Sequence, residues 1–247
     1  MQLPLDLAAA PAARLANFVP GPNQEALAAA RRCAQGALRA LYFWGAQGTG
    51  RSHLLTAIAA EQAEQAERSG WAAPSGQAGH AHAGRKARAL SQHIPIEQFV
   101  FDPGITCWLL DDVEQLDRSR QEAAFHLFNA VMAHPGAVFA AAGSQPPARL
   151  GQLGLMPELA TRLGYGLVIQ LQPLAEDDIA AALKLTLQER GLSASAELIP
   201  WLLTHAPRNL GQLRGLIDAL DRYALARHRA LTIPLLRDFE RDAQGPL

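Results

Sequence analysis

Two short segments carry residue types that together suit phosphate chemistry. The first is a glycine-rich run with the spacing Gly-x4-Gly-Arg-Ser, made of Gly45, Ala46, Gln47, Gly48, Thr49, Gly50, Arg51 and Ser52. Glycines let backbone N–H groups turn inward around phosphate oxygens, and a hydroxyl at the last position can bind Mg²⁺. A short apolar run precedes this motif and a helical pattern follows it, which is the context that gives it meaning. The sequence therefore predicts a P-loop that binds ADP or ATP.

The second segment is a pair of carboxylates, Asp111 and Asp112. It follows an apolar run over 105–110 that is typical of a buried parallel strand. A carboxylate at such a strand end can hold the Mg²⁺ of a bound nucleotide, here Asp111 together with Ser52, while Asp112 can orient or activate water. A solvated acidic pair is the alternative, and the P-loop makes it the weaker one. The two segments together predict Mg²⁺ as a companion of the nucleotide.

Arg51 occupies the position at which the P-loop motif has lysine. The substitution keeps the positive charge, but a guanidinium group is broad and planar, whereas an ammonium group is a compact point donor. We therefore expect this site to bind nucleotide and to hydrolyse it slowly.

Apolar runs and helical stripes alternate along the first two-thirds of the chain. The runs predict buried strands at 40–44, 105–110, 137–142 and 167–171. Asn23 can cap a helix that begins there. Alternating strands and helices predict an α/β fold with a parallel sheet. One further strand is expected between the P-loop helix and residue 105, and its candidates are Ile96 and 99–101.

The character of the chain changes at two places. Residues 69–92 are low in large apolar side chains, which predicts a flexible loop or a poorly formed edge element. The histidines of this region, His80, His82 and the nearby His93, have no cysteine or fixed scaffold beside them, so a metal site is disfavoured. After Pro173 the pattern is wholly helical and predicts a small second domain.

Bulk composition limits the function classes. The chain has 247 residues, 49% of them hydrophobic, which suffices for a substantial core, and its formal net charge of -1 gives no basic field for nucleic acid. We find no signal peptide and no run of the ~18 apolar residues that a membrane span needs. Cys33 and Cys107 are far apart and predict buried apolar thiols. These features predict a cytoplasmic protein without membrane association that meets DNA only indirectly.

Read in order, the motifs resemble the AAA+ module of the bacterial initiator DnaA. The resemblance covers nearly the whole chain apart from 69–100, and its further segments are 17–23, 109–113, 143–147 and 158–166. It implies a P-loop AAA+ parallel sheet flanked by helices over 17–172, in which 69–100 is variable. It also implies a small all-helical C-terminal lid domain over 173–247 and a short N-terminal tail over 1–16.

Three shorter features are similar to the Hda family, the regulatory inactivators of DnaA. They are the P-loop variant at 50–53, the Leu-Asp-Arg segment at 220–222, and a tail that looks like a sliding-clamp-binding motif, made of Gln2, Leu3, Pro4, Leu5, Asp6 and Leu7. An extended tail places its leucines on one side, ready for an apolar groove, although a packed edge strand or a frayed terminus would share this pattern. The resemblance implies the DNA polymerase sliding clamp and DnaA as partners and leaves homo-oligomers open.

The resemblance also implies roles for single residues. Arg162 is similar to the family's arginine finger, which stabilises the transition state on a neighbour's ATP, although a surface arginine is the simpler alternative. Arg208 is similar to the sensor 2 arginine, which reaches the phosphates from the lid. Ser144 stands where DnaA-like proteins tend to have Asp, so its role as sensor 1 is open. Nucleotide contacts are further implied for Phe18, Val19, Asn23 and His53.

These features support two functional hypotheses. In the first, the protein docks on the sliding clamp, holds nucleotide, which the resemblance implies is ADP, and presents Arg162 to DnaA-bound ATP, so that it inhibits replication initiation. In the second, it is a self-sufficient AAA+ ATPase that loads a helicase or remodels a protein, for which Ser52, Asp111 and Asp112 provide the chemistry. A third hypothesis, an adaptor that acts on DNA directly through DnaA-like assembly, is disfavoured by the near-neutral charge.

Overall fold

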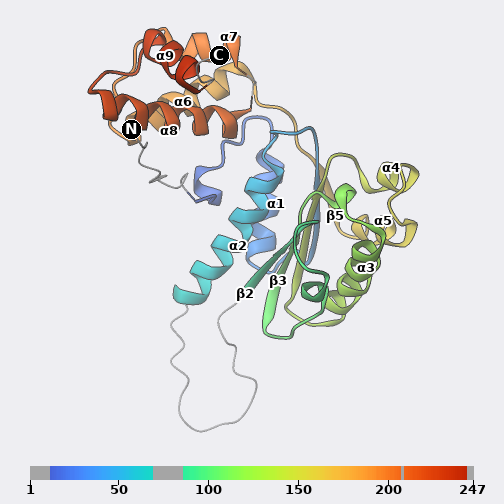
Figure 1. Ribbon diagram of the computed structural model, residues 1–247. Coiled ribbons are helices and arrows are strands. Elements are labelled where there is room, and N and C mark those ends of the chain that lie inside the picture. Colours follow the sequence, from blue (N-terminus) through green and yellow to red (C-terminus); the bar gives the residue numbers. More distant parts are fainter. Residues whose placement is uncertain (1–11, 69–85, 207–208, 244–247) are drawn as a thin grey trace. The chain divides into compact units, whose positions relative to one another are not determined.

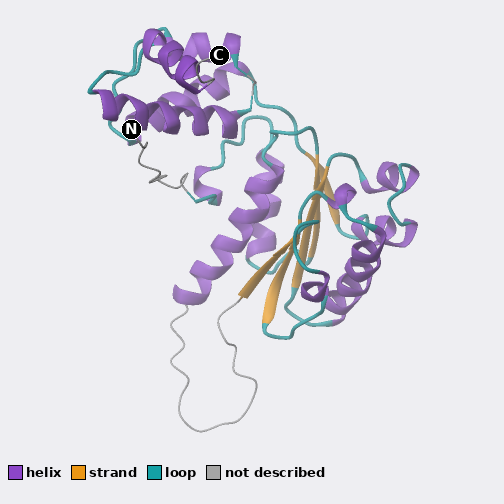
Figure 2. Ribbon diagram, in the orientation of Figure 1, coloured by secondary structure: helices purple, strands orange, loops and turns teal. Residues whose placement is uncertain are grey.

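The computed structural model describes residues 12–68, 86–206 and 209–243, and it divides into two compact units (Figure 1). One unit comprises Ala13–Pro173 and is called here the sheet unit; the other begins at Leu174 and is called the lid unit. Figure 2 shows that the strands belong to the sheet unit, whereas the lid unit is built of helices. Gln2 to Leu7, His80, His82 and Arg208, for which the sequence predicts roles or disfavours a metal, lie outside the described residues.

The sheet unit is built on a five-stranded sheet whose paired strands are all parallel. The strands are β1 (Ala40–Trp44), β2 (Lys86–Leu90), β3 (Ile105–Leu110), β4 (Val138–Gly143) and β5 (Leu167–Gln170), in the spatial order β2-β3-β4-β1-β5. β4 therefore lies between the strand before the P-loop and the strand before the acidic pair. The prediction of a parallel α/β sheet is confirmed.

Helices cover both faces of this sheet (Figure 1). α1 (Gln24–Ala34) and α2 (Arg51–Arg68) lie on one face, and α3 (Arg118–Ala133), α4 (Pro147–Gln152) and α5 (Pro157–Leu163) lie on the other. Successive side chains of a strand point to opposite faces, so Trp108 of β3 packs with α3 while Cys107 packs with α1 and α2. Cys33 and Cys107 are both buried as predicted, and burial raises the pKa of the Cys33 thiol to about 12.

The second strand of the chain lies elsewhere than at its predicted candidates. Ile96–Phe99 forms a short 3-10 turn, η2, and β2 occupies Lys86–Leu90 at the edge of the sheet. Phe99 is buried against α3, where its apolar side chain contributes to the core. Because β2 is an exposed edge strand with only Leu90 buried, its sequence lacks the apolar run by which the central strands were found. The alternative of an edge element within 69–92 is thus the correct one.

The lid unit has its own apolar core. Its helices are α6 (Glu176–Glu189), α7 (Leu198–His205), α8 (Leu210–Arg227) and α9 (Ile233–Ala243), and Leu183, Leu202 and Ile217 are fully buried among them. Asn209 caps α8, since its side chain accepts a hydrogen bond from the Gln212 backbone N–H. Among the described residues, no helix is long and apolar enough to cross a membrane, and no cluster of metal-binding side chains is found.

Candidate nucleotide-binding site

The P-loop joins the end of β1 to the start of α2. Gly48 and Gly50 have φ values of 86° and 97°, which only glycine adopts readily, so these positions require the residue type that the sequence has. The Thr49 hydroxyl donates to the Ala46 carbonyl at 2.9 Å and closes the turn, while Ala46 to Gly48 stay exposed. The loop therefore presents its backbone to solvent at the positive N-terminal end of an 18-residue helix, where an anion is stabilised.

The segment before α1 packs directly on the P-loop. A Cβ atom placed on Gly50 would lie 2.8 Å from the Phe18 ring carbon Cε2, so the ring rests against the loop backbone. The same ring lies 5.6 Å from the His53 ring, centroid to centroid, and His53 Nε2 lies 3.1 Å from the Arg14 carbonyl oxygen. The structure thus brings Phe18 and His53 together with Gly50, and Val19 follows as a half-buried neighbour in the chain.

Asn23 serves a different purpose from the helix cap predicted for it. It precedes α1, but its side chain makes no capping hydrogen bond. Instead its Nδ2 donates to the Gln172 carbonyl at 2.9 Å, and its Oδ1 accepts from the Gln172 backbone N–H at 2.7 Å. The side chain is almost fully buried and ties the start of α1 to the segment after β5. The two hydrogen bonds of its amide group therefore fix the start of α1 against the segment after β5.

The acidic pair follows β3 at the same edge of the sheet as the P-loop, because the strands are parallel. Asp111 Oδ1 accepts from the Asp112 backbone N–H at 2.9 Å, and Asp112 has a left-handed backbone with φ 45°. Burial, together with the neighbouring Asp111 charge, raises the pKa of Asp112, and Arg51 partly opposes this shift. Ser52 is exposed in the first turn of α2. Ser52 and Asp111 are thus both available at this edge for a nucleotide-bound cation.

Arg51 lies among carboxylates. Its side chain is only 10% exposed; its Nη2 lies 3.4 Å from Asp112 Oδ1, and its Nη1 lies 3.8 Å from Glu114 Oε1. Nη1 is buried and has no hydrogen-bond partner within the described part of the chain. An arginine with unsatisfied buried donors fits a site for additional anionic oxygens. The exposed P-loop backbone and this side chain together fit a nucleotide phosphate.

Glu114 is the residue of this site that the sequence analysis missed. It lies in η3 (Val113–Gln115), directly after the acidic pair, and its Oε1 also accepts the Ser144 backbone N–H at 3.0 Å. Next to it, the Tyr42 hydroxyl donates to the Gln145 carbonyl at 3.0 Å, and burial followed by the Glu114 charge raises the pKa of Tyr42. No sequence spacing identifies Glu114 as a site residue, because its contact with the Ser144 N–H forms only when β4 lies beside η3 in the fold.

Arg162 lies apart from these residues. It stands in the last turn of α5, half-buried, with its guanidinium carbon 5.7 Å from the centre of the Phe125 ring of α3. Such a cation–π contact contributes about 0.5–2 kcal/mol, depending on how far the pair is withdrawn from water, so it holds the side chain of Arg162 against α3.

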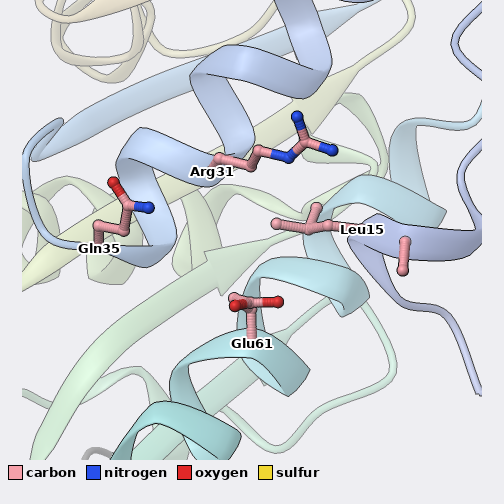
Figure 3. Close-up of a pocket in the computed structure, with 5 residues that line it drawn as sticks. Leu15, Arg31, Gln35 and Glu61 are labelled. Atoms are coloured by element: carbon pink, nitrogen blue, oxygen red, sulfur yellow. The ribbon is translucent and has the colours of Figure 1, made fainter.

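A separate pocket lies between η1 (Leu15–Asn17), α1 and α2 (Figure 3). It has a volume of about 190 Å³ and is lined by Leu15, Ala16, Arg31, Gln35 and Glu61. None of these belongs to the predicted site residues. The P-loop constellation, and not this pocket, is the candidate nucleotide site.

Comparison with known proteins agrees with this fold. The family model of the bacterial DnaA ATPase domain matches residues 11–170, and the model of the Hda lid domain matches residues 176–239. The first match spans more than half of the chain. The chain therefore belongs to the family of bacterial DnaA ATPase domains, with a lid of the Hda kind.

Solved structures show the same fold. Domain III of DnaA from Thermotoga maritima has a TM-score of 0.71 and 22% sequence identity, with 97% of this chain and 99% of that chain covered. DnaA bound to AMPPCP from Aquifex aeolicus has a TM-score of 0.62 and 21% identity, with 85% and 65% covered. A RuvB mutant from Thermotoga maritima has a TM-score of 0.62 and 12% identity, with 92% and 71% covered. This chain spans about two-thirds of the Aquifex aeolicus DnaA structure.

Proposed function

We propose that this protein is a negative regulator of replication initiation that docks on the DNA polymerase sliding clamp and promotes hydrolysis of ATP bound to DnaA. One observation carries the proposal: a DnaA-type ATPase domain and an Hda-type lid domain occur together in this chain. In the proposal, the DnaA-type module pairs with DnaA itself. The Hda-type lid favours regulation of the initiator over initiation.

The P-loop of this protein binds an adenine nucleotide in the proposal. One of the structurally similar DnaA proteins is bound to AMPPCP, an ATP analogue, which supports this ligand class. Ser52 and Asp111 would hold the accompanying Mg²⁺, which neutralises phosphate charge. The ion pairs of Arg51 with Asp112 and Glu114 compete with the phosphates for its guanidinium group, which supports slow hydrolysis at this site. In the proposal the bound nucleotide is ADP. It stabilises the folded arrangement of the module and is not itself hydrolysed.

Arg162 supplies the chemistry in trans. An arginine that reaches a partner's γ-phosphate stabilises the charge of the transition state and accelerates hydrolysis by ~10³–10⁵ in the best-studied cases. The contact of Arg162 with Phe125 is a weak one, so in the proposal it is exchanged for a phosphate of the partner's ATP. The ATP that is consumed belongs to DnaA.

The test is hydrolysis of labelled ATP on DnaA in the presence of DNA-loaded clamp. Arg162→Ala is expected to reduce the stimulated rate by up to ~10³-fold, because the transition-state charge loses its partner. Arg118→Ala removes an exposed arginine that pairs with Glu122 on α3 and serves as the matched control, with an unchanged rate expected. Full stimulation by Arg162→Ala would exclude the arginine-finger role.

Deletion of residues 2–7 tests clamp docking in the same assay. Loss of the alternating leucines is expected to abolish capture of this protein by immobilised clamp and to lower hydrolysis only when the clamp is present. Unchanged capture would refute the docking assignment while leaving Arg162 untouched.

The self-sufficient ATPase is the second candidate, since Ser52 and Asp111 both lie at the carboxyl edge of the sheet. It requires robust ATP turnover by the purified protein alone, lost on Asp111→Asn. The proposal made here expects this turnover to be slow.

A further inference from the structure

Glu114 contacts two parts of the candidate site at once. A single oxygen, Oε1, lies 3.8 Å from Arg51 Nη1 and accepts the Ser144 backbone N–H at 3.0 Å. Its other oxygen, Oε2, is buried and has no hydrogen-bond partner in the described part of the chain. The carboxylate therefore links the P-loop to the first residue after β4.

On one side, this carboxylate lies close to the end of β4. A Cβ atom placed on Gly143 would lie 2.2 Å from the Tyr42 hydroxyl oxygen and 2.9 Å from Glu114 Oε2, so only glycine fits there. The Tyr42 hydroxyl in turn holds the Gln145 carbonyl at 3.0 Å. The Glu114 side chain is 24% exposed, so its carboxylate can shift, and such a shift alters its contact with the segment from Gly143 to Gln145.

The guanidinium of Arg51 is shared and incompletely satisfied. It faces Asp112 at 3.4 Å and Glu114 at 3.8 Å, and Nη1 makes no hydrogen bond to any residue that the structure describes. A phosphate would offer the bidentate oxygens that these two side chains do not. Phosphate binding must then weaken the attraction between Arg51 and Glu114, since both anions draw on one cation.

We propose that Glu114 is a positioning residue of the nucleotide site, whose carboxylate competes with phosphate for Arg51. When phosphate draws Arg51 away, the carboxylate shifts, and its hydrogen bond with the Ser144 N–H transmits this shift to the loop after β4. The inference rests on the proposed binding of nucleotide by this P-loop. If Glu114 acts in this way, the backbone N–H of Ser144 responds to nucleotide binding, independently of the Ser144 side chain. The inference also assigns a consequence to arginine in the P-loop: the longer, planar group spans the distance to two carboxylates.

Glu114→Gln tests the competition. The amide keeps the size of the side chain and an oxygen that can accept from Ser144, but it removes the charge that holds Arg51. Binding of a fluorescent ADP analogue with Mg²⁺ is expected to become about three- to tenfold tighter, since one competing charge near the arginine is gone. Glu122→Gln removes an exposed carboxylate of α3 and is the matched control, with unchanged affinity expected.

The coupling has its own readout. In the unsubstituted protein, nucleotide is expected to speed hydrogen exchange of the Ser144 amide; in Glu114→Gln this response is expected to be absent, because no ionic attraction is lost. In an Arg51→Ala background, Glu114→Gln is expected to change nucleotide affinity by a clearly smaller factor, because only the direct repulsion between Glu114 and the phosphates is then removed. Should Glu114→Gln fail to fold, Glu114→Asp, which withdraws the carboxylate by one methylene group, is expected to change affinity in the same direction by a smaller factor.

The outcomes separate this inference from the proposed function. If the unsubstituted protein binds no nucleotide, both are overturned. If it binds nucleotide but Glu114→Gln binds equally or more weakly, only the competition is overturned. If Glu114→Gln changes affinity equally with and without Arg51, or if the Ser144 amide ignores nucleotide, the assignment of Glu114 as a link between the two is wrong.

Discussion

Single residues of the P-loop carry constraints from both backbone and packing. Gly50 combines a φ of 97° with a neighbouring Phe18 ring that would lie 2.8 Å from any Cβ. The two constraints have separate origins: the first comes from the turn itself and the second from the segment before α1. Phe18 therefore belongs to the site through its contact with the loop backbone, independently of any contact with a ligand.

Gly50→Ala separates these constraints. The substitution adds left-handed strain of about 1–3 kcal/mol and also pushes against Phe18, so it is expected to lower stability and to weaken nucleotide binding by tenfold or more. Gly136→Ala is the matched control, since Gly136 has a φ of 82° but nothing within 4 Å of a new Cβ. Chemical denaturation and nucleotide titration of both variants give the comparison. Equal losses of stability in the two would show that Phe18 adds nothing.

At the scale of elements, the sheet order brings the chemistry together. β4 lies between β1 and β3, so the loops after all three strands share one edge. Two hydrogen bonds of the Asn23 side chain also link the start of α1 to Gln172, which follows β5. The site is therefore held by hydrogen bonds between elements that are distant in the sequence.

Asn23→Ala tests this link. Its loss leaves the Gln172 N–H and carbonyl without their side-chain partner, which is expected to lower stability by about 1–2 kcal/mol and to speed exchange of the Gln172 amide. Asn209→Ala removes a helix cap in the lid unit and is expected to leave that amide unaffected. Unchanged protection of Gln172 in Asn23→Ala would show that the two hydrogen bonds do not hold this segment.

At the scale of the whole molecule, family and fold define a sheet unit and a lid unit, and nucleotide is proposed for the first. A ligand that binds only the folded state stabilises it by about 2.7 kcal/mol at a concentration 100 times its Kd. For a unit of this size each kcal/mol raises the melting temperature by about 2–4 °C. We therefore expect ADP with Mg²⁺ to raise it by roughly 5–10 °C in differential scanning fluorimetry. Mg²⁺ alone is the control, and an unchanged melting temperature at saturating ADP would contradict a nucleotide role.

Features that depend on neighbouring residues could be predicted from the amino-acid sequence alone. The P-loop needs glycines between a strand and a helix, and the three central strands and the edge strand β5 have short apolar runs. Both are local patterns, and the structure has these four strands within a residue of their predicted bounds. The family resemblance, confirmed by the family models, rested on the same local segments.

Features that depend on long-range contacts could not be predicted in this way, because they arise only in the folded chain. β2 at Lys86–Leu90 is recognised by its pairing with β3, because an edge strand needs little apolar surface. Asn23 was predicted to cap a helix, yet it finds a better-placed partner 149 residues away. Glu114 belongs to the site because two contacts form only in the folded chain. The Ser144 N–H directly after β4 donates to its carboxylate, and Arg51 at the start of α2 lies beside it. The P-loop consists of neighbouring residues and can be read from the sequence. The carboxylates that compete with phosphate for Arg51 are brought to it only by folding.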